Sequence, residues 1–307
     1  MTYHYSKAYH ICGQGAVFYI QSKLCSIMNL KFSLFSRIYR KFEVQRLSDF
    51  PKILGDLPDF PSSSATYKQY KFLTLKGAKN NYQTIFDISK QRKAPIISLA
   101  NIKFSPKQMI LANNLESAFN KFGSDKASTH NYHLLYALAL NINQIKRYDI
   151  LEIGIGSNNL MVPSNMGKFG KPGASLRSWS SLGKNYFVIG ADIDRNILFE
   201  EERITTSYLD QTEESSWMHF LSVIKNKKFD LIIDDGLHAP LSNLLTVKYL
   251  TSFLKPDGVL IIEDISQRSL PIWQLLIAIS RTSLNFKLMK TKAAYVLIIK
   301  NKNFKIF

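Results

Sequence analysis

The sequence contains very little cysteine. Its 307 residues include two cysteines, Cys12 and Cys25, both near the N-terminus. One pair at this spacing provides neither a disulfide framework nor a zinc-binding pattern. Scarce cysteine is typical of proteins from a reducing compartment. We therefore expect a cytoplasmic protein that is stabilised by an apolar core, to which 46% hydrophobic residues would contribute.

Long hydrophobic runs are also missing. No stretch approaches the roughly 18 consecutive apolar residues that a membrane-spanning helix requires. The run at 11–20 is short, contains two glycines and does not follow the basic segment of a signal peptide. We therefore expect no transmembrane segment.

Acidic residues are scarce relative to basic ones. The chain has 40 Lys and Arg against 23 Asp and Glu, a formal charge of +17, and residues 1–100 hold 15 against 5. This excess suggests a polyanionic neighbour (an anionic membrane, a nucleic acid or a phosphorylated substrate) or simply a solvated basic surface. The basic, aromatic segment 24–42 suits a helix on a membrane surface, although such a segment more often packs its aromatic side chains into a core or an oligomer interface. We expect residues 1–103 to form an accessory or assembly region, with homo-oligomers and peripheral membrane contact.

Two apolar runs end in paired carboxylates. Residues 229–238 read FDLIIDDGLH, and residues 254–265 read LKPDGVLIIEDI with turn chemistry at 255–258. Each run predicts a buried parallel strand, and ligands bind beyond the carboxyl ends of such strands. Acids crowded there favour a divalent cation. The alternative is that the first pair caps a helix beginning near Pro240.

A histidine follows the first acid pair. Histidine is the side chain that exchanges protons most readily near neutral pH, so His238 is suited to accept a proton beside the metal-binding acids. His130 and His133 near the start of another predicted helix are better explained by capping or packing. Ser128 or Thr129 is the expected cap of that helix.

A glycine motif follows an earlier strand. Residues 151–156 read LEIGIG, and a second strand ends in Asp192 within IGADID. Glycines let the backbone approach a ligand closely, and an acid ending the next strand suits ribose hydroxyls. This pair of motifs suggests a nucleoside-type cofactor.

Strand and helix signals alternate from residue 104 to residue 307. The expected helices cover 106–122, 174–182, 217–225, 244–254 and 273–280, and the strands 286–290 and 294–299 close the pattern as an antiparallel pair. Such alternation predicts one α/β domain with a doubly wound, mostly parallel sheet.

Together these motifs resemble class I S-adenosylmethionine-dependent methyltransferases, and in detail the macrocin O-methyltransferase and cephalosporin hydroxylase-like family. The matching pieces are FGSDKASTHNY (122–132), LEIGIG (151–156), GASLRSW (173–179), IGADID (189–194), LDQ (209–211), IIDDGLH (232–238) and LKPDGVLIIEDI (254–265). The resemblance extends over about two thirds of the chain. Asn158 departs from the pattern, since many methyltransferases have a third glycine there.

The resemblance implies a Rossmann-like methyltransferase fold, S-adenosyl-L-methionine and Mg²⁺. The implied cofactor-binding residues are Glu152, Gly154, Gly156, Asp192, Asp210, Gln211 and Asp234, the implied metal ligands are Asp235, Glu263 and Asp264, and the implied general base is His238. Asp234 would face the cofactor or support the loop.

The expected reaction is therefore Mg²⁺-dependent O-methylation of a sugar or glycan-type small molecule, which the basic charge allows to be anionic. The sequence DDGLH argues against methylation of nucleic-acid bases, which often uses an Asn/Asp-Pro-Pro-aromatic motif at this place. Methylation of RNA ribose or of another small molecule, and a metal-independent methyltransferase, remain alternatives.

Overall fold

The computed structural model describes residues 94–140, 147–280 and 284–301, together with Thr84 and Asp87. The chain divides into compact units between Thr84 and Ile85. Nearly all of the predicted accessory region, including the basic segment 24–42, lies outside the described residues, so its role stays a prediction. Strand β1 (Ile96–Ser98) nevertheless pairs with the main sheet, which therefore begins before the expected boundary at residue 104.

The described residues form a mixed sheet in the order β1-β8-β9-β7-β6-β2-β3-β5-β4. After β1, its strands are β2 (Tyr148–Ile153), β3 (Tyr186–Asp192), β4 (Glu200–Glu201), β5 (Ile204–Tyr208), β6 (Phe229–Asp234), β7 (Leu254–Ile265), β8 (Leu284–Lys290) and β9 (Tyr295–Asn301). The five strands from β7 to β5 in this order are parallel, and β9 is antiparallel to both β7 and β8. The predicted doubly wound sheet with its antiparallel closing pair is confirmed.

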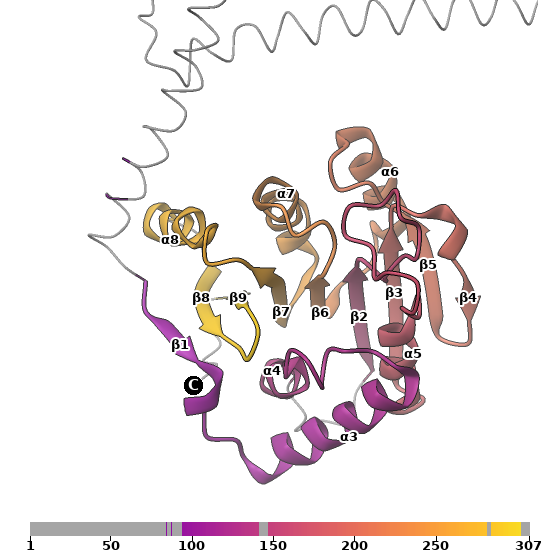
Figure 1. Ribbon diagram of the computed structural model, residues 1–307, viewed down its shortest axis with the longest axis horizontal. Helices are drawn as coiled ribbons and strands as arrows, with labels where there is room; N and C mark the ends of the chain where they lie inside the picture. The colour runs from indigo at the N-terminus through magenta and orange to yellow at the C-terminus, as the bar shows by residue number, and fades with distance from the viewer. Residues whose placement is uncertain (1–83, 85–86, 88–93, 141–146, 281–283, 302–307) are drawn as a thin grey trace, which may run out of the picture. The chain divides into compact units, whose positions relative to one another are not determined.

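Helices cover both faces of the sheet. They are α3 (Pro106–Phe122), α4 (Tyr132–Ala139), α5 (Ala174–Ser181), α6 (Glu214–Ile224), α7 (Pro240–Leu250) and α8 (Leu270–Ile279), with short 3-10 turns at Leu99–Asn101, Arg195–Ile197 and Thr251–Phe253. Figure 1 shows α6, α7 and α8 on one face and α3, α4 and α5 on the other. In the part of the chain that the structure describes, no helix is both long and apolar enough to cross a membrane.

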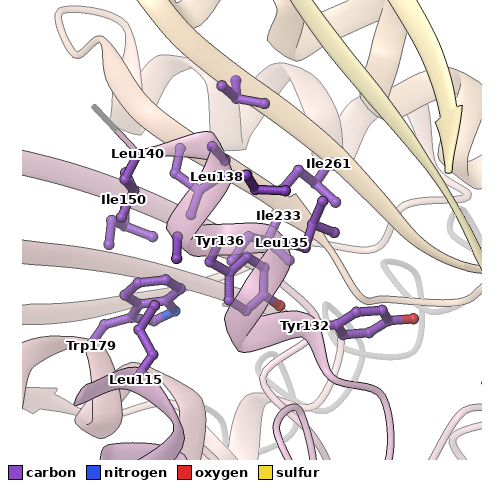
Figure 2. Packing of buried hydrophobic residues seen from close by; sticks show 14 of the residues in the cluster. Leu115, Tyr132, Leu135, Tyr136, Leu138, Leu140, Ile150, Trp179, Ile233 and Ile261 are labelled. Atoms are coloured by element: carbon purple, nitrogen blue, oxygen red, sulfur yellow. The ribbon is translucent and has the colours of Figure 1, made fainter. Parts of the chain in front are cut away.

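Two apolar clusters lie on opposite faces of the sheet because successive side chains of a strand point to opposite faces. Ile150 of β2 belongs to one cluster and its neighbour Leu151 to the other. Figure 2 shows the first cluster, in which Tyr136 and Trp179 meet the aliphatic side chains of the central strands. The ring of Trp179 is fully buried and lies 5.1 Å from that of Tyr136. Helices α4 and α5 are thereby fixed against the sheet.

The order of the strands creates a switch point between β2 and β6. From β2 the chain moves outward through β3 and β5, and it then returns to β6 and continues on the other side to β7. The carboxyl ends of β2 and β6 are consequently neighbours, with Ile153 opposite Asp234 and the Asp235 amide donating to the Ile153 carbonyl at 2.8 Å. Open α/β sheets bind ligands at such a point.

The ends of the first two helices differ in how well their sequence signals predict them. Helix α3 begins at a capping box on Ser105 and ends at Gly123 in the left-handed conformation, in agreement with its predicted bounds. The cap predicted for the next helix is wrong. Helix α4 begins after Asn131, which has a left-handed φ of 54° and makes no side-chain cap, because the segment before it turns toward the acid-rich end of the sheet.

The predicted turn at residues 255–258 is instead part of β7. Phe229 pairs with Leu254, but Leu231 pairs with Val259, so β7 contains more residues than β6 over the same length. The turn residues are accommodated as a bulge. At its end, a Cβ atom on Gly258 would lie 2.5 Å from the carbonyl oxygen of Phe229, so only glycine fits without movement of the backbone.

We predict that Gly258→Ala lowers the free energy of unfolding by roughly 1–3 kcal/mol, because the added methyl group meets rigid backbone. Gly183→Ala is the matched control, since its Cβ would meet the Asn185 side-chain oxygen at 2.8 Å, and that side chain can rotate. Chemical denaturation of both variants measures the difference. Equal losses of stability would contradict the close approach in β7.

Candidate active site

Carboxylates from the ends of three parallel strands converge at one edge of the sheet. Glu152 comes from β2, Asp235 directly follows β6, and Glu263 and Asp264 lie near the end of β7. Glu152 and Glu263 are fully buried, whereas the side chains of Asp235 and Asp264 are about one quarter exposed. The structure therefore brings together Asp235, Glu263 and Asp264, as the sequence predicted, and adds Glu152, which was predicted to bind the cofactor.

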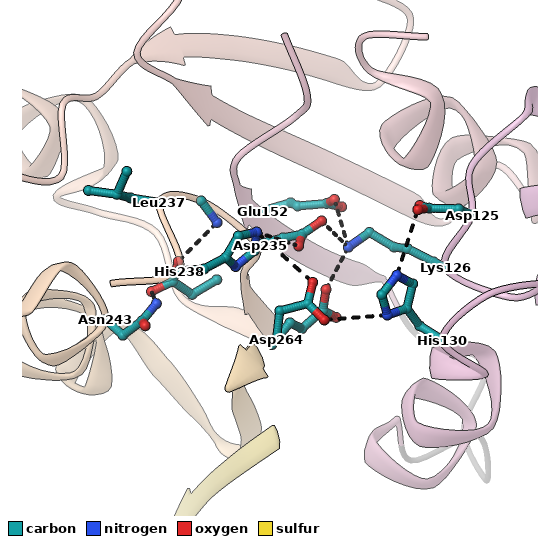
Figure 3. A network of polar contacts seen from close by, with 12 residues as sticks. Asp125, Lys126, His130, Glu152, Asp235, Leu237, His238, Asn243 and Asp264 are labelled. Atoms are coloured by element: carbon teal, nitrogen blue, oxygen red, sulfur yellow. Dashed lines mark hydrogen bonds and ion pairs between the residues drawn. The ribbon is translucent and has the colours of Figure 1, made fainter. Parts of the chain in front are cut away.

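A lysine from outside the sheet neutralises part of this cluster. Lys126 lies in the segment between α3 and α4, and its Nζ atom lies 2.7 Å from both Asp235 Oδ2 and Glu263 Oε2 and 3.5 Å from Glu152 Oε1 (Figure 3). Only 4% of its side chain is exposed. Burial lowers the pKa of Lys126, but the charges of Asp235 and Glu263 outweigh burial and hold it well above its usual value. Lys126 is therefore a charged group at neutral pH.

Two buried tyrosines bind the acids of β7. The hydroxyl of Tyr136 donates to Glu263 Oε1, and the hydroxyl of Tyr132 donates to Asp264 Oδ1 at 2.7 Å. Both tyrosines come from helix α4. The bonds to Tyr136 and Lys126 engage both oxygens of Glu263, so this predicted metal ligand has protein partners in the described arrangement.

His130 forms a second cationic contact with the cluster. Its Nδ1 atom lies 3.3 Å from Asp264 Oδ1, its Nε2 atom lies 3.7 Å from Asp125 Oδ2, and its ring stacks on Tyr132. The contact with Asp125, together with that to Asp264, raises the pKa of His130 to about 10. Burial raises the pKa of Asp264, but His130 and Tyr132 outweigh it and lower that pKa to about 2. His130 therefore does more than cap or pack its helix, because it contacts two acids of the site. His133 is buried, which agrees with the expected packing role.

His238 lies beside the two partly exposed acids, Asp235 and Asp264. Its Nε2 atom is 3.8 Å from Asp235 Oδ1 and 4.0 Å from Asp264 Oδ2, and 31% of its side chain is exposed. One ligand atom from each of these three residues lies within 4.8 Å of the others. The open group of metal donors is therefore Asp235, Asp264 and His238, and it differs from the predicted set of ligands by exchanging Glu263 for His238.

Two of these three donors have unusual backbone conformations. His238 has a φ of 55° and Asp264 a φ of 52°, values that non-glycine residues adopt at an energetic cost. Asp264 also lies where the pairing of β7 with β9 shifts register, between Ile262 and Ile265. A bulge re-aims side chains at the end of a strand. It brings the Asp264 carboxylate toward His238 and Tyr132.

A cavity of about 300 Å³ opens beside this cluster. It is lined by Glu152, Gly154, Lys126 and His238, among other residues. Neither carboxylate oxygen of Glu152 accepts a hydrogen bond from a described residue, and burial raises the pKa of this group. A buried acid without a hydrogen-bond donor, facing a cavity, suits an amino group of a ligand. A Cβ on Gly154 would meet the carbonyl oxygen of Asp235 at 2.1 Å, so glycine is required where β2 passes β6.

A second cavity, of about 220 Å³, adjoins the first at Gly154, Gly156 and Asp235. Asp192, Asp210 and Gln211, which were predicted to bind the nucleoside part of a cofactor, line it. The Asp192 oxygens accept the backbone amides of Ile155 and Asp194, each at 2.9 Å. Asp192 therefore links the glycine loop after β2 to the end of β3.

Asp234 supports the loop after β6. It is fully buried and accepts hydrogen bonds from Gln211 Nε2 at 2.9 Å, Asn243 Nδ2 at 3.0 Å and the Gly236 amide at 3.3 Å. It lines neither of the two cavities. Of the two expected roles of Asp234, these contacts favour loop support over cofactor contact.

Sequence reasoning missed Lys126, His130, Tyr132 and Tyr136 as members of the site. All four belong to the segment 122–136, most of which was recognised as a motif. The motif marked the segment without indicating which of its side chains face the acids. The proximity of this segment to the switch point would have been needed to identify them.

Comparisons with known proteins agree with the resemblance seen in the sequence. No family model matches the chain. The 8-demethyl-8-alpha-L-rhamnosyl tetracenomycin-C 2'-O-methyltransferase of Streptomyces olivaceus is 27% identical over 154 residues, which are 50% of this chain and 38% of that protein. The demethylmacrocin O-methyltransferase of Streptomyces fradiae is 31% identical over 116 residues, which are 38% of this chain and 27% of that protein. The chain thus spans well under half the length of these relatives.

Among solved structures, MycE methyltransferase from the mycinamycin biosynthetic pathway, in complex with Mg, SAH and mycinamycin VI, is similar to this chain. Its TM-score is 0.49 at 17% identity, and the match covers 76% of this chain and 57% of that one. The two curated relatives confirm the expected resemblance to macrocin-type O-methyltransferases for the aligned part of the chain.

The raised pKa of His130 predicts a loss of stability at alkaline pH. Because its pKa rises from 6.5 to about 10 on folding, its stabilising charge is fully present below about pH 6.5 and disappears as the pH rises through about 10. Denaturation of the wild type and His130→Gln in a chelating buffer should give a stability difference that shrinks over this range. His133→Gln is the control: burial lowers the pKa of His133 from its ordinary 6.5, so its effect on stability changes only below that pH and the stability difference should stay constant over this range. A pH-independent difference for His130→Gln would contradict the assignment.

Proposed function

We propose that this chain, a relative of the macrocin-type O-methyltransferases, transfers a methyl group from S-adenosyl-L-methionine to a hydroxyl group of a sugar or glycan-type acceptor. The proposed cations are Mg²⁺ or a similar divalent ion. The observation that carries this proposal is the junction of the two cavities at Gly154, Gly156 and Asp235, directly beside the carboxylates of Asp235 and Asp264 and the imidazole of His238.

The residues around the two cavities suit the parts of the cofactor. Asp192, Asp210 and Gln211 would bind the nucleoside portion in the smaller cavity. Glu152 would bind the amino group of the methionine portion, because its buried oxygens accept no hydrogen bond from described residues. When bound, S-adenosylmethionine supplies an electrophilic methyl group and Mg²⁺ supplies a Lewis acid for hydroxyl oxygens.

The acids and His238 have separate roles in this proposal: Asp235 and Asp264 bind the cation, and His238 accepts the proton. Asp235 and Asp264 present carboxylate oxygens, which divalent cations prefer, to the larger cavity. An alcohol becomes a good nucleophile only when its proton leaves, and His238 lines the same cavity with its imidazole 31% exposed. We therefore assign His238 as the general base. The ion pairs it forms with both acids would stabilise the imidazolium that results.

The names of the relatives support a sugar acceptor. The tetracenomycin enzyme is named for methylation at the 2' position of a rhamnosyl compound, and the other for demethylmacrocin. A vicinal pair of sugar hydroxyls would suit two carboxylates that hold one cation. We propose that the acceptor is a glycoside or nucleotide-linked sugar.

A metal-independent methyltransferase is the second candidate, and Lys126 favours it. Its ammonium group already bridges Asp235 and Glu263 at 2.7 Å. A chelator separates the candidates, because turnover that is unchanged in its presence would support the metal-independent reaction.

We predict that Asp192→Asn weakens the binding of S-adenosylhomocysteine by about 1–3 kcal/mol, because the loop amides and the ligand lose a charged partner. Asp194→Asn is the matched control, since Asp194 follows the same strand but lines neither cavity. Calorimetry on both variants measures the effect. The cofactor assignment fails if the folded wild type binds neither S-adenosylmethionine nor its product.

We predict that His238→Ala slows methyl transfer by roughly 10²–10⁴-fold while the affinity for S-adenosylhomocysteine stays unchanged. His219→Ala, which alters an exposed histidine on α6, should retain full activity. The measurement uses a labelled methyl donor and the best acceptor from a screen of sugars, glycosides and nucleotide-linked sugars. Near-full activity of His238→Ala would exclude its role as the base.

A further inference from the structure

Lys126 occupies the position of a shared cation. Its ammonium group contacts carboxylates at the carboxyl ends of three different strands, and it reaches them from a segment that is not part of the sheet (Figure 3). The distance of 2.7 Å to each of Asp235 and Glu263 is that of a short, charge-assisted hydrogen bond. The acids of β6 and β7 are therefore joined through a cation that belongs to the protein.

A metal ion that bridged the same two oxygens would need the same space. Divalent cations bind carboxylate oxygens at about 2.0–2.6 Å, which leaves no room for an ammonium group between them. Asp235 is able to bind Lys126 and a metal ion with different oxygens, because its Oδ2 atom binds Lys126 while its Oδ1 atom faces His238 at 3.8 Å. Glu263 differs in this respect, because both of its oxygens have protein partners: Oε2 accepts from Lys126 and Oε1 accepts from the Tyr136 hydroxyl.

The ammonium group has an alternative partner close by. Glu152 Oε1 lies 3.5 Å from Lys126 Nζ, and neither Glu152 oxygen accepts a hydrogen bond from a described residue. Lys126 also lines the larger cavity, so a small rotation of its flexible side chain meets open space. A carboxylate accepts several hydrogen bonds, and Glu152 is therefore able to bind Lys126 and a ligand amino group together.

We propose that Lys126 is a built-in counter-ion of the acid cluster: it holds Asp235 and Glu263 together in the metal-free protein, and a divalent cation that bridges these two carboxylates displaces its ammonium group toward Glu152. This inference rests on the proposed role of Asp235 as a metal ligand. It explains why the open donor group contains His238 in place of the predicted ligand Glu263. In the described arrangement, Glu263 is held by Lys126 and Tyr136.

The test compares the binding of Mn²⁺ to the wild type and to Lys126→Met in the absence of cofactor, by calorimetry. Removal of a competing cation should increase the affinity of the variant about tenfold or more. The melting temperature of the variant in chelator should also be lower than that of the wild type, because its acids lack a counter-ion. Added Mn²⁺ should raise the melting temperature of the variant more than that of the wild type. Equal or weaker affinity of Lys126→Met would overturn the inference while leaving the metal site intact.

Lys255→Met is the matched control. Lys255 bridges Asp149 and Asp230 at 2.8 and 2.6 Å near the opposite ends of strands β2, β6 and β7. Its loss should lower stability without changing the affinity for Mn²⁺. If neither the wild type nor Lys126→Met binds Mn²⁺, the proposed metal site itself fails, and the inference fails with it.

A measurement on the wild type covers the case in which Lys126→Met does not fold. Amine-reactive labelling followed by mass spectrometry should find Lys126 protected in chelator, as its exposure of 4% implies, and more reactive when Mn²⁺ saturates the protein. The labelling of Lys255 should not change. Unchanged protection of Lys126 at saturating Mn²⁺ would overturn the inference.

Discussion

The candidate site depends on the pairing of one buried ammonium group with carboxylates from neighbouring strands. Parallel strands that end in acids bring like charges together, which is unfavourable without a cation. Lys126 provides that cation at 2.7 Å from Asp235 and Glu263, and His130 provides another beside Asp264. The segment between α3 and α4 is consequently held against the carboxyl ends of the sheet by charge as well as by packing.

The backbone around these acids is adapted to hold them at short range. Gly154 allows β2 to pass close to the carbonyl of Asp235, and a bulge in β7 directs Glu263 and Asp264 to the same side of the site. Asp264 and His238 both adopt left-handed conformations. Such local costs persist where the surrounding structure fixes them, as the tyrosine hydrogen bond to Asp264 does here.

The loop after β2 lines both cavities and lies beside the acid cluster, so a ligand bound in the cavities would be held next to the acids. The larger cavity contacts Glu152, His238 and Asp264, whereas the smaller one contacts Asp192 and Gln211. A ligand that extends through both would thus place one end beside the open donor group. Because Asp235 lines both cavities, movement of Lys126 would alter the charge at their junction.

The sequence by itself determined the alternation of strands and helices along the chain, the acids at the strand ends and the glycine loop, because apolar periodicity and turn chemistry are local properties. It also placed Asp235 and Asp264 in one site. Only the tertiary structure decided that Lys126 meets Asp235 and Glu263, from which it is separated by 109 and 137 residues, and that the turn signal at 255–258 becomes a bulge. The partners of a buried charge depend on the balance between desolvation and pairing, and that balance exists only once the segments are packed together.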